Sequence, residues 1–326
     1  MTLVRLRLDP WPGDYEGPFQ LEESEEEPAG KIDPDVEGIA WSPIQPERIE
    51  RPEPLFFVDG VRRIDARVIA DDDSGRIVHG LFGSVACGAV RVERAKAAFE
   101  EVRIRRYIVL GSGLMAQPQV MTVGNTELAF APYSVAETSP TAPLLGLQNL
   151  MRTEEAAIAQ DHAQEAACVF ADGPLTYFAA VKQRTVGVIK RLFKAYLPAS
   201  NFALVPRLAL AERTPLFAII DGYDRFSWYL RIGMPRPMDH DVAGVLRMEV
   251  RTGVGVETAV ELANLSASCI PAFAGDSARD PRAPQNLLPV GALEQELRHR
   301  LGDAIAIRRA IERVLFARTL EKEAEA

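Results

Sequence analysis

Two short apolar segments, each followed by an Asp-Gly pair, constrain the fold of this chain more than any other feature. Residues 55–58 are fully apolar and end at Asp59-Gly60, and residues 168–175 repeat the pattern with Asp172-Gly173. Apolar runs of this length are typical of strands buried on both faces of a sheet. The sequence therefore predicts two buried strands, with a turn at Asp59-Gly60 and a further strand over residues 64–70.

Strand ends that each carry a carboxylate can place hard oxygen ligands side by side. Asp59 and Asp172 would then match the preference of Mg²⁺ or Mn²⁺ for oxygen ligands. Asp-Gly is also common in ordinary turns, and one copy predicts no more than a turn. The second copy is what favours a metal site.

Length and composition indicate a soluble α/β protein with one decorated domain or about two domains. The chain has 326 residues, of which 47% are hydrophobic and 25% charged. It has no apolar run of about 18 residues and no apolar signal core at its start, so we expect a cytoplasmic protein without a membrane segment. The cysteines are widely spaced among apolar neighbours, which predicts buried free thiols: Cys87, Cys168 and Cys269.

The acidic charge is confined to the N-terminal segment. Residues 1–55 hold fourteen acidic and five basic side chains, a net charge of −9, which equals the charge of the whole chain. The remaining residues therefore sum to zero, and the charge does not exclude a DNA substrate. We expect an acidic, Pro/Glu-rich arm over residues 1–54, tethered by Trp11, Phe19 and Trp41, followed by a folded domain over residues 55–326.

The hydrophobic pattern of the domain predicts a mixed sheet flanked by helices, with extra strands and C-terminal helices. Three meandering strands, a helix and a carboxylate-ended strand together form a ribonuclease-H-like arrangement. Residues 111–143 are predicted to be a long Gly/Pro-rich connection. Further strands are predicted at 77–92, 104–110, 185–189, 216–220, 226–232 and 244–250, and helices at 144–167, 256–270, 290–301 and 303–318.

Two further segments carry candidate DNA contacts. Lys190, Arg191 and Lys194 alternate with aromatic residues in KRLFKAYL, which suits phosphate contact and base stacking. A solvent-facing amphipathic helix has the same pattern. Arg279 and Arg282 lie in a polar loop with several prolines, of a kind that often lines sites, although a capped turn before the next helix is the simpler reading.

The ordered segments VDGVRRIDARV, MRTEEAAIAQ, ADGPLTYF, VGVIKRLF and DPRAPQNLLPVGALEQELRHRLGD resemble the NurA family of DNA-end-processing nucleases over roughly residues 55–318. The resemblance implies a ribonuclease-H-like, Mn²⁺-dependent nuclease that acts on DNA as a homodimer with the hexameric HerA translocase ATPase. Matched by motif, it implies Asp59, Glu155 and Asp172 as metal ligands, with Glu154 as the alternative to Glu155. It also implies Lys190 as a basic residue of the catalytic site.

The late part of the family pattern is altered. Leu288-Pro289 stands where archaeal members show Tyr-Pro, and no histidine follows at the expected spacing, which leaves Asp280 and Arg282 as candidates to compensate. Phosphodiester hydrolysis is often performed by two cations about 4 Å apart, and clustered carboxylates would hold them. Two alternatives stay open: an inert scaffold that seats a partner ATPase, and a phosphohydrolase acting on small nucleotides.

Overall fold

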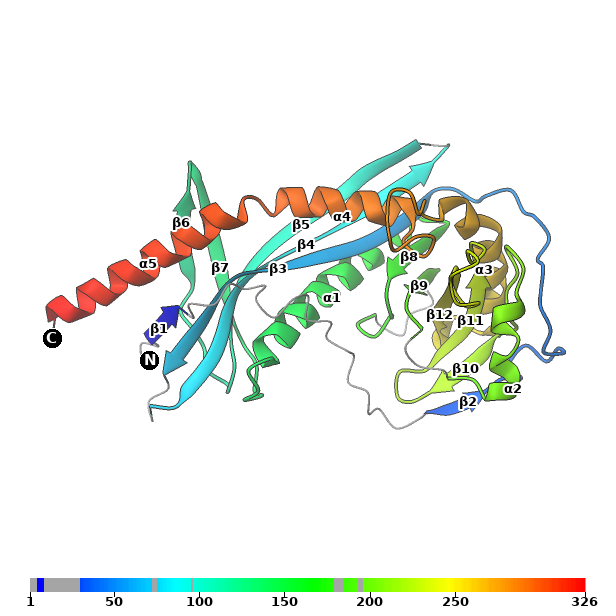
Figure 1. Ribbon diagram of the computed structural model, residues 1–326, viewed down its shortest axis with the longest axis horizontal. Helices are drawn as coiled ribbons and strands as arrows, with labels where there is room; N and C mark the ends of the chain where they lie inside the picture. The colour runs from blue at the N-terminus through cyan, green and yellow to red at the C-terminus, as the bar shows by residue number, and fades with distance from the viewer. Residues whose placement is uncertain are drawn as a thin grey trace.

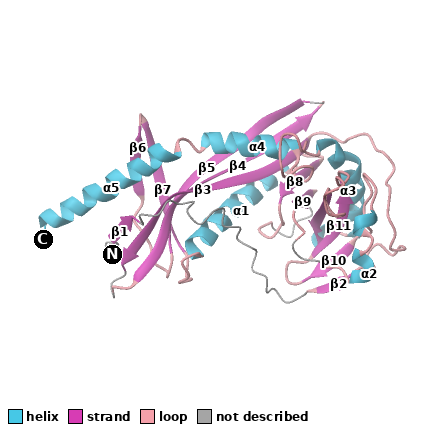
Figure 2. Cartoon of the chain, in the orientation of Figure 1, coloured by secondary structure: helices cyan, strands magenta, loops and turns pink. Residues whose placement is uncertain are grey.

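The structure is a computed structural model that describes residues 5–8, 30–71, 75–94, 96–178, 184–192 and 196–325. It is a mixed α/β fold in which one sheet of twelve strands has the order β2-β10-β11-β12-β9-β8-β3-β4-β5-β7-β6, with β1 paired to β3 (Figure 1). Figure 2 shows long strands running through the middle of the molecule, with helices on both sides.

The strands are β1 (Arg5–Leu8), β2 (Lys31–Asp33), β3 (Leu55–Asp71), β4 (Ile77–Glu93), β5 (Lys96–Leu110), β6 (Gln119–Val123), β7 (Thr126–Ser134), β8 (Cys168–Asp172), β9 (Thr185–Ile189), β10 (Phe217–Ile220), β11 (Arg225–Arg231) and β12 (Val245–Arg251). The α-helices are α1 (Ala142–His162), α2 (Ala199–Phe202), α3 (Val256–Cys269), α4 (Leu288–Arg300) and α5 (Ala304–Glu325). Short 3-10 helices lie at Val205–Arg207, Thr252–Val254 and Ile270–Phe273.

The stretch around Asp59-Gly60 is one uninterrupted strand, so the turn predicted there is wrong. β3 continues for 17 residues, and Asp59 and Gly60 pair with Gly88 and Cys87 of the antiparallel β4. On its other edge, β3 pairs in parallel with β8 up to Val58. Because neighbouring strands bind the backbone, the Asp-Gly pair stays extended and places a carboxylate in the middle of a strand.

The segment over residues 111–143, predicted to be a long connection, contains a β-hairpin instead. β6 and β7 pair antiparallel across the two-residue loop Gly124-Asn125, in which Gly124 has a φ of 60°. Gly-Asn between two short strands is itself a hairpin signal, and the sequence analysis did not use it. Boundaries also differ: β5 begins at Lys96 rather than residue 104, and β8 ends at Asp172 rather than residue 175. α1 ends at His162 rather than residue 167, because the chain turns there to enter β8.

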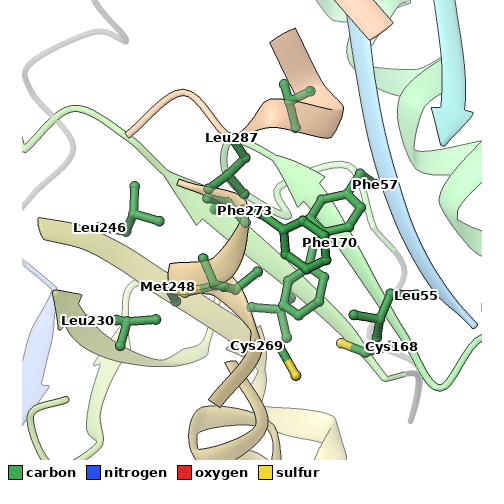
Figure 3. Packing of buried hydrophobic residues seen from close by; sticks show 14 of the residues in the cluster. Leu55, Phe57, Cys168, Phe170, Leu230, Leu246, Met248, Cys269, Phe273 and Leu287 are labelled. Atoms are coloured by element: carbon green, nitrogen blue, oxygen red, sulfur yellow. The ribbon is translucent and has the colours of Figure 1, made fainter. Parts of the chain in front are cut away.

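Helices cover both faces of the central strands. On one face, α1 packs on a core that includes Phe56. On the other, α3 and α4 enclose the largest core, where the ring of Phe57 contacts those of Phe170 and Phe273 (Figure 3). Side chains alternate along a strand, so Phe56 and Phe57 enter different cores. Asp59 shares the direction of Phe57 and therefore faces the α4 side.

Residues 30–54 are attached to the end of the sheet formed by β10 and β11. β2 pairs antiparallel with β10. Glu37 accepts two hydrogen bonds, of 3.0 and 2.8 Å, from the guanidinium of the fully buried Arg213. Trp41 donates its indole N–H to a backbone carbonyl of α2 at 2.9 Å. The other two predicted anchors, Trp11 and Phe19, lie outside the described residues.

The three cysteines, Cys87, Cys168 and Cys269, are free and buried, which confirms the prediction. Among the helices that the structure describes, none is both long and apolar enough to cross a membrane.

Candidate metal centre

Asp59 and Asp172 lie side by side on adjacent parallel strands. β3 and β8 are in register, with Val58 opposite Ala171, and each aspartate is the next residue along its strand. Opposed residues on neighbouring strands face the same side of a sheet, so both carboxylates face α4. Asp172 is the last residue of β8, and Gly173 follows with a φ of 89°, which turns the chain away.

A third carboxylate, Glu294, comes from α4. One oxygen of each of Asp59, Asp172 and Glu294 lies within 4.8 Å of the others. Leu293 and Leu297 of α4 enter the large core, and their burial places this turn of the helix over the sheet. Glu294 was not among the residues predicted from the sequence, although GALE belongs to the segments that carry the family resemblance. The signal available in the sequence was an acidic residue directly beside a leucine on the apolar face of the predicted helix.

Glu155 approaches β3 from the opposite face of the sheet. It lies on α1 with 4% of its surface exposed, whereas Glu154 turns toward Arg103 and Arg105, at 3.9 and 3.5 Å. A Cβ atom at Gly60 would lie 2.5 Å from Oε1 of Glu155, so glycine is needed for this approach. Among the described residues, Glu155 is outside the group of three carboxylates, but it is the member of the 154/155 pair that lies against β3.

Two basic side chains connect these acidic groups. Lys190, which follows β9, donates from Nζ to Asp172 Oδ2 at 2.9 Å and to Asn286 Oδ1 at 2.7 Å. Arg152 of α1 donates from Nη1 to Glu155 Oε2 at 3.0 Å and to the backbone carbonyl of Asp172 at 2.7 Å. Lys190 therefore binds the side chain at the end of β8, while Arg152 binds its backbone.

The negative charges around Asp59 are only partly offset by nearby positive charge. Burial, reinforced by the carboxylate of Asp172, raises the pKa of Asp59 well above its usual value. Burial also raises the pKa of Glu155, and Arg152 offsets this effect only in part. For Lys190, burial acts to lower the pKa, but the nearby carboxylates of Asp172 and Asp59 outweigh it and the pKa is raised. Lys190 therefore stays protonated beside the carboxylates.

Two buried oxygens at this site, Asp59 Oδ2 and Glu155 Oε1, accept no hydrogen bond within the described part of the chain. Buried polar atoms are nearly always paired, so an unpartnered carboxylate oxygen is available to bind a cation. Three carboxylates whose oxygens lie this close form the donor set that Mg²⁺ and Mn²⁺ prefer. The side chains of Asp59, Asp172 and Glu294 therefore fit a divalent cation.

The loop before α4 borders this site. Asp280 accepts a hydrogen bond from Asn286 Nδ2 at 2.7 Å. Arg282 donates to both carboxylate oxygens of Glu294, at 2.9 and 2.7 Å, and also to Asp280. Hydrogen bonding from Arg282 holds the pKa of Asp280 well below its usual range. The loop thus connects Lys190 to Glu294 through polar side chains.

Among the five residues predicted to contact DNA, those that the structure describes lie in different surroundings. Lys190 lies inside the carboxylate site, and Arg191 beside it is exposed. The side chain of Arg279 is 83% exposed, whereas Arg282 binds Glu294. Lys194 lies outside the described residues. Lys190 and Arg282 each contact a member of the carboxylate group.

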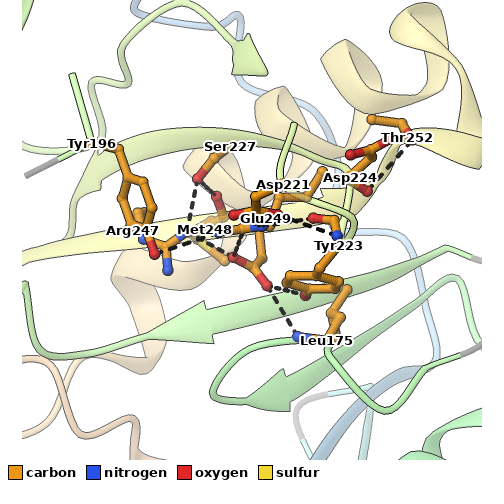
Figure 4. Close-up of polar contacts among 11 residues, drawn as sticks. Leu175, Tyr196, Asp221, Tyr223, Asp224, Ser227, Arg247, Met248, Glu249 and Thr252 are labelled. Atoms are coloured by element: carbon orange, nitrogen blue, oxygen red, sulfur yellow. Dashed lines mark hydrogen bonds and ion pairs between the residues drawn. The ribbon is translucent and has the colours of Figure 1, made fainter. Parts of the chain in front are cut away.

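Another buried carboxylate, Glu249 of β12, lies on the face of the sheet away from α4. Figure 4 shows the polar side chains around it. It accepts hydrogen bonds from the backbone N–H of Leu175 at 3.0 Å, from Arg247 Nη1 at 2.7 Å and from the hydroxyl of Tyr223. Arg225 Nε lies 3.4 Å from Oε2 of Glu249, the oxygen that also accepts from Arg247. Through Leu175, Glu249 holds the turn that follows β8.

No protein-family model matches the sequence, and no curated protein matches it. Among solved structures, the chain is similar to the NurA nuclease from Sulfolobus solfataricus, with 11% sequence identity, coverage of 85% of this chain and 87% of that chain, and a TM-score of 0.43. The similarity concerns the course of the backbone.

Proposed function

We propose that this chain is a metal-dependent nuclease that hydrolyses phosphodiester bonds of DNA. The observation that carries the proposal is the group formed by Asp59, Asp172 and Glu294, with the ammonium of Lys190 against it. A divalent cation bound by such a group activates water near neutral pH and neutralises charge on the phosphate. Closely spaced carboxylates with an unpartnered buried oxygen provide the ligands that this chemistry requires.

In this proposal, the side chains have different roles in binding metal and phosphate. Asp59 and Asp172 would hold Mn²⁺ or Mg²⁺ from the sheet, and Glu294 would hold it from α4. Glu155, whose Oε1 is unpartnered among the described residues, is the candidate ligand for a second ion. Lys190 is fixed by two hydrogen bonds, and its ammonium would bind and orient the scissile phosphate.

The finer parts of the proposal come from the family resemblance of the sequence. We propose that the chain acts at DNA ends as a homodimer with a HerA-like hexameric ATPase, in DNA repair or in defence against foreign DNA. The acidic segment before residue 30 would serve that assembly, because acidic chains with a few aromatic residues suit binding to a basic partner surface. Residues 30–54, although acidic too, contribute β2 and Glu37 to the fold.

A cleavage assay tests the proposal. End-labelled linear DNA and covalently closed circular DNA are incubated with Mn²⁺, Mg²⁺ or EDTA, with and without the translocase. Linear DNA should be degraded only with a divalent ion, and the variants Asp59→Asn, Asp172→Asn and Glu294→Gln should lose cleavage because each removes a ligand charge without opening a cavity. Glu154→Gln is the matched control, since Glu154 faces Arg103 and Arg105.

Other results would point elsewhere. Full cleavage by Asp59→Asn with Mn²⁺ would contradict the metal assignment, and equal cleavage of circular and linear DNA would contradict action at ends. A chain that binds the translocase but cleaves nothing with any ion would be the inert scaffold. Hydrolysis of nucleotides without cleavage of DNA would identify a small-molecule phosphohydrolase.

A further inference from the structure

Arg282 is not one of the proposed metal ligands, but its guanidinium contacts the carboxylate of Glu294. We propose that Arg282 is a positioning residue that orients Glu294 toward Asp59 and Asp172, and that it does not bind DNA. The inference rests on the proposed metal centre and assigns a role to the loop that precedes α4.

The contact between Arg282 and Glu294 defines the plane of the carboxylate. Nη1 lies 2.9 Å from Oε1 and Nη2 lies 2.7 Å from Oε2, so each oxygen accepts one bond from the planar guanidinium. Such paired bonds are directional as well as strong. A carboxylate has about four acceptor positions, so two remain for a cation.

The guanidinium is itself held in place by Asp280. Nε lies 3.1 Å from Oδ1 and Nη2 lies 3.0 Å from Oδ2 of that carboxylate. Together, Asp280 and Glu294 engage the guanidinium in four hydrogen bonds, against the five N–H donors of an arginine. Arg282 therefore has little donor capacity left for a phosphate.

The other end of the loop reaches Lys190, which binds Asp172 on the sheet side of the metal centre. Asn286 is 2% exposed, donates to Asp280 at 2.7 Å and accepts from Lys190 at 2.7 Å. Lys190 in turn binds Asp172. A continuous series of polar contacts therefore runs from Glu294 on the helix to Asp172 on the sheet, and Arg282 is its first member.

The sequence of α4 accommodates this loop. A Cβ atom at Gly291 would lie 3.3 Å from Nδ2 of Asn286, closer than most side-chain contacts. Gly291 and Glu294 are three residues apart and so lie on one side of the helix. The glycine of GALE lets the loop approach, and the glutamate one turn later meets Arg282.

Arg279 offers a matched control in the same loop. Its side chain is 83% exposed, and its Nε lies 4.0 Å from a carboxylate oxygen of Asp276. Arg279→Ala therefore removes the same charge from the same loop without touching Glu294 or Asp280. Arg279→Ala tests for an effect of the net charge of the loop, and Arg282→Lys, which keeps the positive charge beside Glu294, separates the orientation of that carboxylate from its electrostatics.

The experiment measures Mn²⁺ binding and DNA binding separately. Mn²⁺ titration of the full chain without DNA should show an affinity about 10–100-fold weaker in Arg282→Ala, as expected for loss of a residue that orients a ligand. Arg282→Lys should fall between this variant and the wild type, because an ammonium does not bind both oxygens in one plane. Arg279→Ala should keep the wild-type Mn²⁺ affinity. In EDTA, the salt dependence of DNA binding should have the same slope in Arg282→Ala as in the wild type.

Two results would overturn the inference: wild-type Mn²⁺ affinity in a folded Arg282→Ala protein, or a DNA-binding slope reduced by about one with Mn²⁺ affinity intact. If Arg282→Ala does not fold, Arg282→Lys and Arg282→Gln carry the same comparison. Asp59→Asn separates this inference from the proposed function. If Asp59→Asn abolishes Mn²⁺ binding and Arg282→Ala changes nothing, only the role of Arg282 fails; if Asp59→Asn also changes nothing, the metal centre fails with it.

Discussion

Two carboxylates buried in the same sheet, Glu249 and Asp59, differ in what surrounds them. Glu249 is fully buried and accepts hydrogen bonds from a backbone N–H, a tyrosine hydroxyl and Arg247, with Arg225 also close (Figure 4). Asp59 is 4% exposed, its Oδ2 has no hydrogen-bond partner within the described residues, and its neighbours include the carboxylates of Asp172 and Glu294.

The difference shows how to separate a structural carboxylate from a candidate ligand. Burial alone does not distinguish the two carboxylates, because both are buried. The donors around Glu249 satisfy its charge. Binding a further cation there would therefore not stabilise the folded protein. Around Asp59, burial and the like charge of Asp172 raise the pKa, and Oδ2 has no partner among the described residues, so an added cation would lower the energy of the folded state.

The largest expected effect is on the stability of the metal-free protein. Glu249→Gln should destabilise it by about 3–5 kcal/mol, because the buried guanidinium of Arg247 loses its charged partner and Arg225 is left with Asp221. Asp59→Asn should leave the free energy of unfolding unchanged or raise it, since it removes a carboxylate that is costly to ionise. Urea unfolding in EDTA measures both. Equal losses in the two variants would contradict the comparison.

A second, smaller effect should appear as a pH dependence of metal binding. Because the pKa of Asp59 is raised in the fold, the metal-free protein loses stability as the pH rises from the unfolded pKa through the folded one. Mn²⁺ must displace that proton, so its affinity should rise with pH, by up to about tenfold per unit for one proton. The rise in Tm produced by Mn²⁺ should therefore be larger at about pH 7.5 than at about pH 5.5.

Asp59→Asn is the control for the metal-free protein: in EDTA, its free energy of unfolding should lose the pH dependence that comes from the raised pKa of Asp59. A Tm shift of equal size at both pH values in the wild-type protein would show that Asp59 is not deprotonated by metal binding. A strong pH dependence of unfolding in EDTA that survives in Asp59→Asn would assign the proton to Glu155, whose pKa is also raised.

The smallest expected effect concerns the contact with DNA. Lys190→Ala should weaken binding about equally for all sequences and reduce the slope of log affinity against log salt by about one, because one phosphate contact is lost. Filter binding or fluorescence anisotropy in EDTA over a salt series measures this slope. Lys31→Ala, in β2 beyond β10, is the control and should keep it. An unchanged slope in Lys190→Ala would mean that Lys190 only balances Asp172.

Local patterns in the sequence were sufficient for much of the fold. Runs of apolar residues and helical periodicity predicted β8, β9 and the strands from β10 to β12, together with α1, α3, α4 and most of α5, with ends displaced by a few residues. They also selected Asp59 and Asp172, because an acidic residue that follows a run of apolar residues is visible within a short window of sequence. We expected neighbouring strands to bring these two carboxylates together. The register of β3 and β8 supports this expectation.

Tertiary structure decided the features that depend on partners distant in the sequence. Asp59-Gly60 stays extended because β4 supplies its backbone hydrogen bonds, whereas the same dipeptide in isolation favours a turn. Glu155 rather than Glu154 meets β3 because packing sets the rotation of α1 about its axis. Glu294 joins Asp59 and Asp172, and Arg282 binds Glu294, because α4 and the loop before it fold back over strands more than a hundred residues earlier. No local window contains those contacts, so only the folded chain determines the third carboxylate and the arginine that holds it.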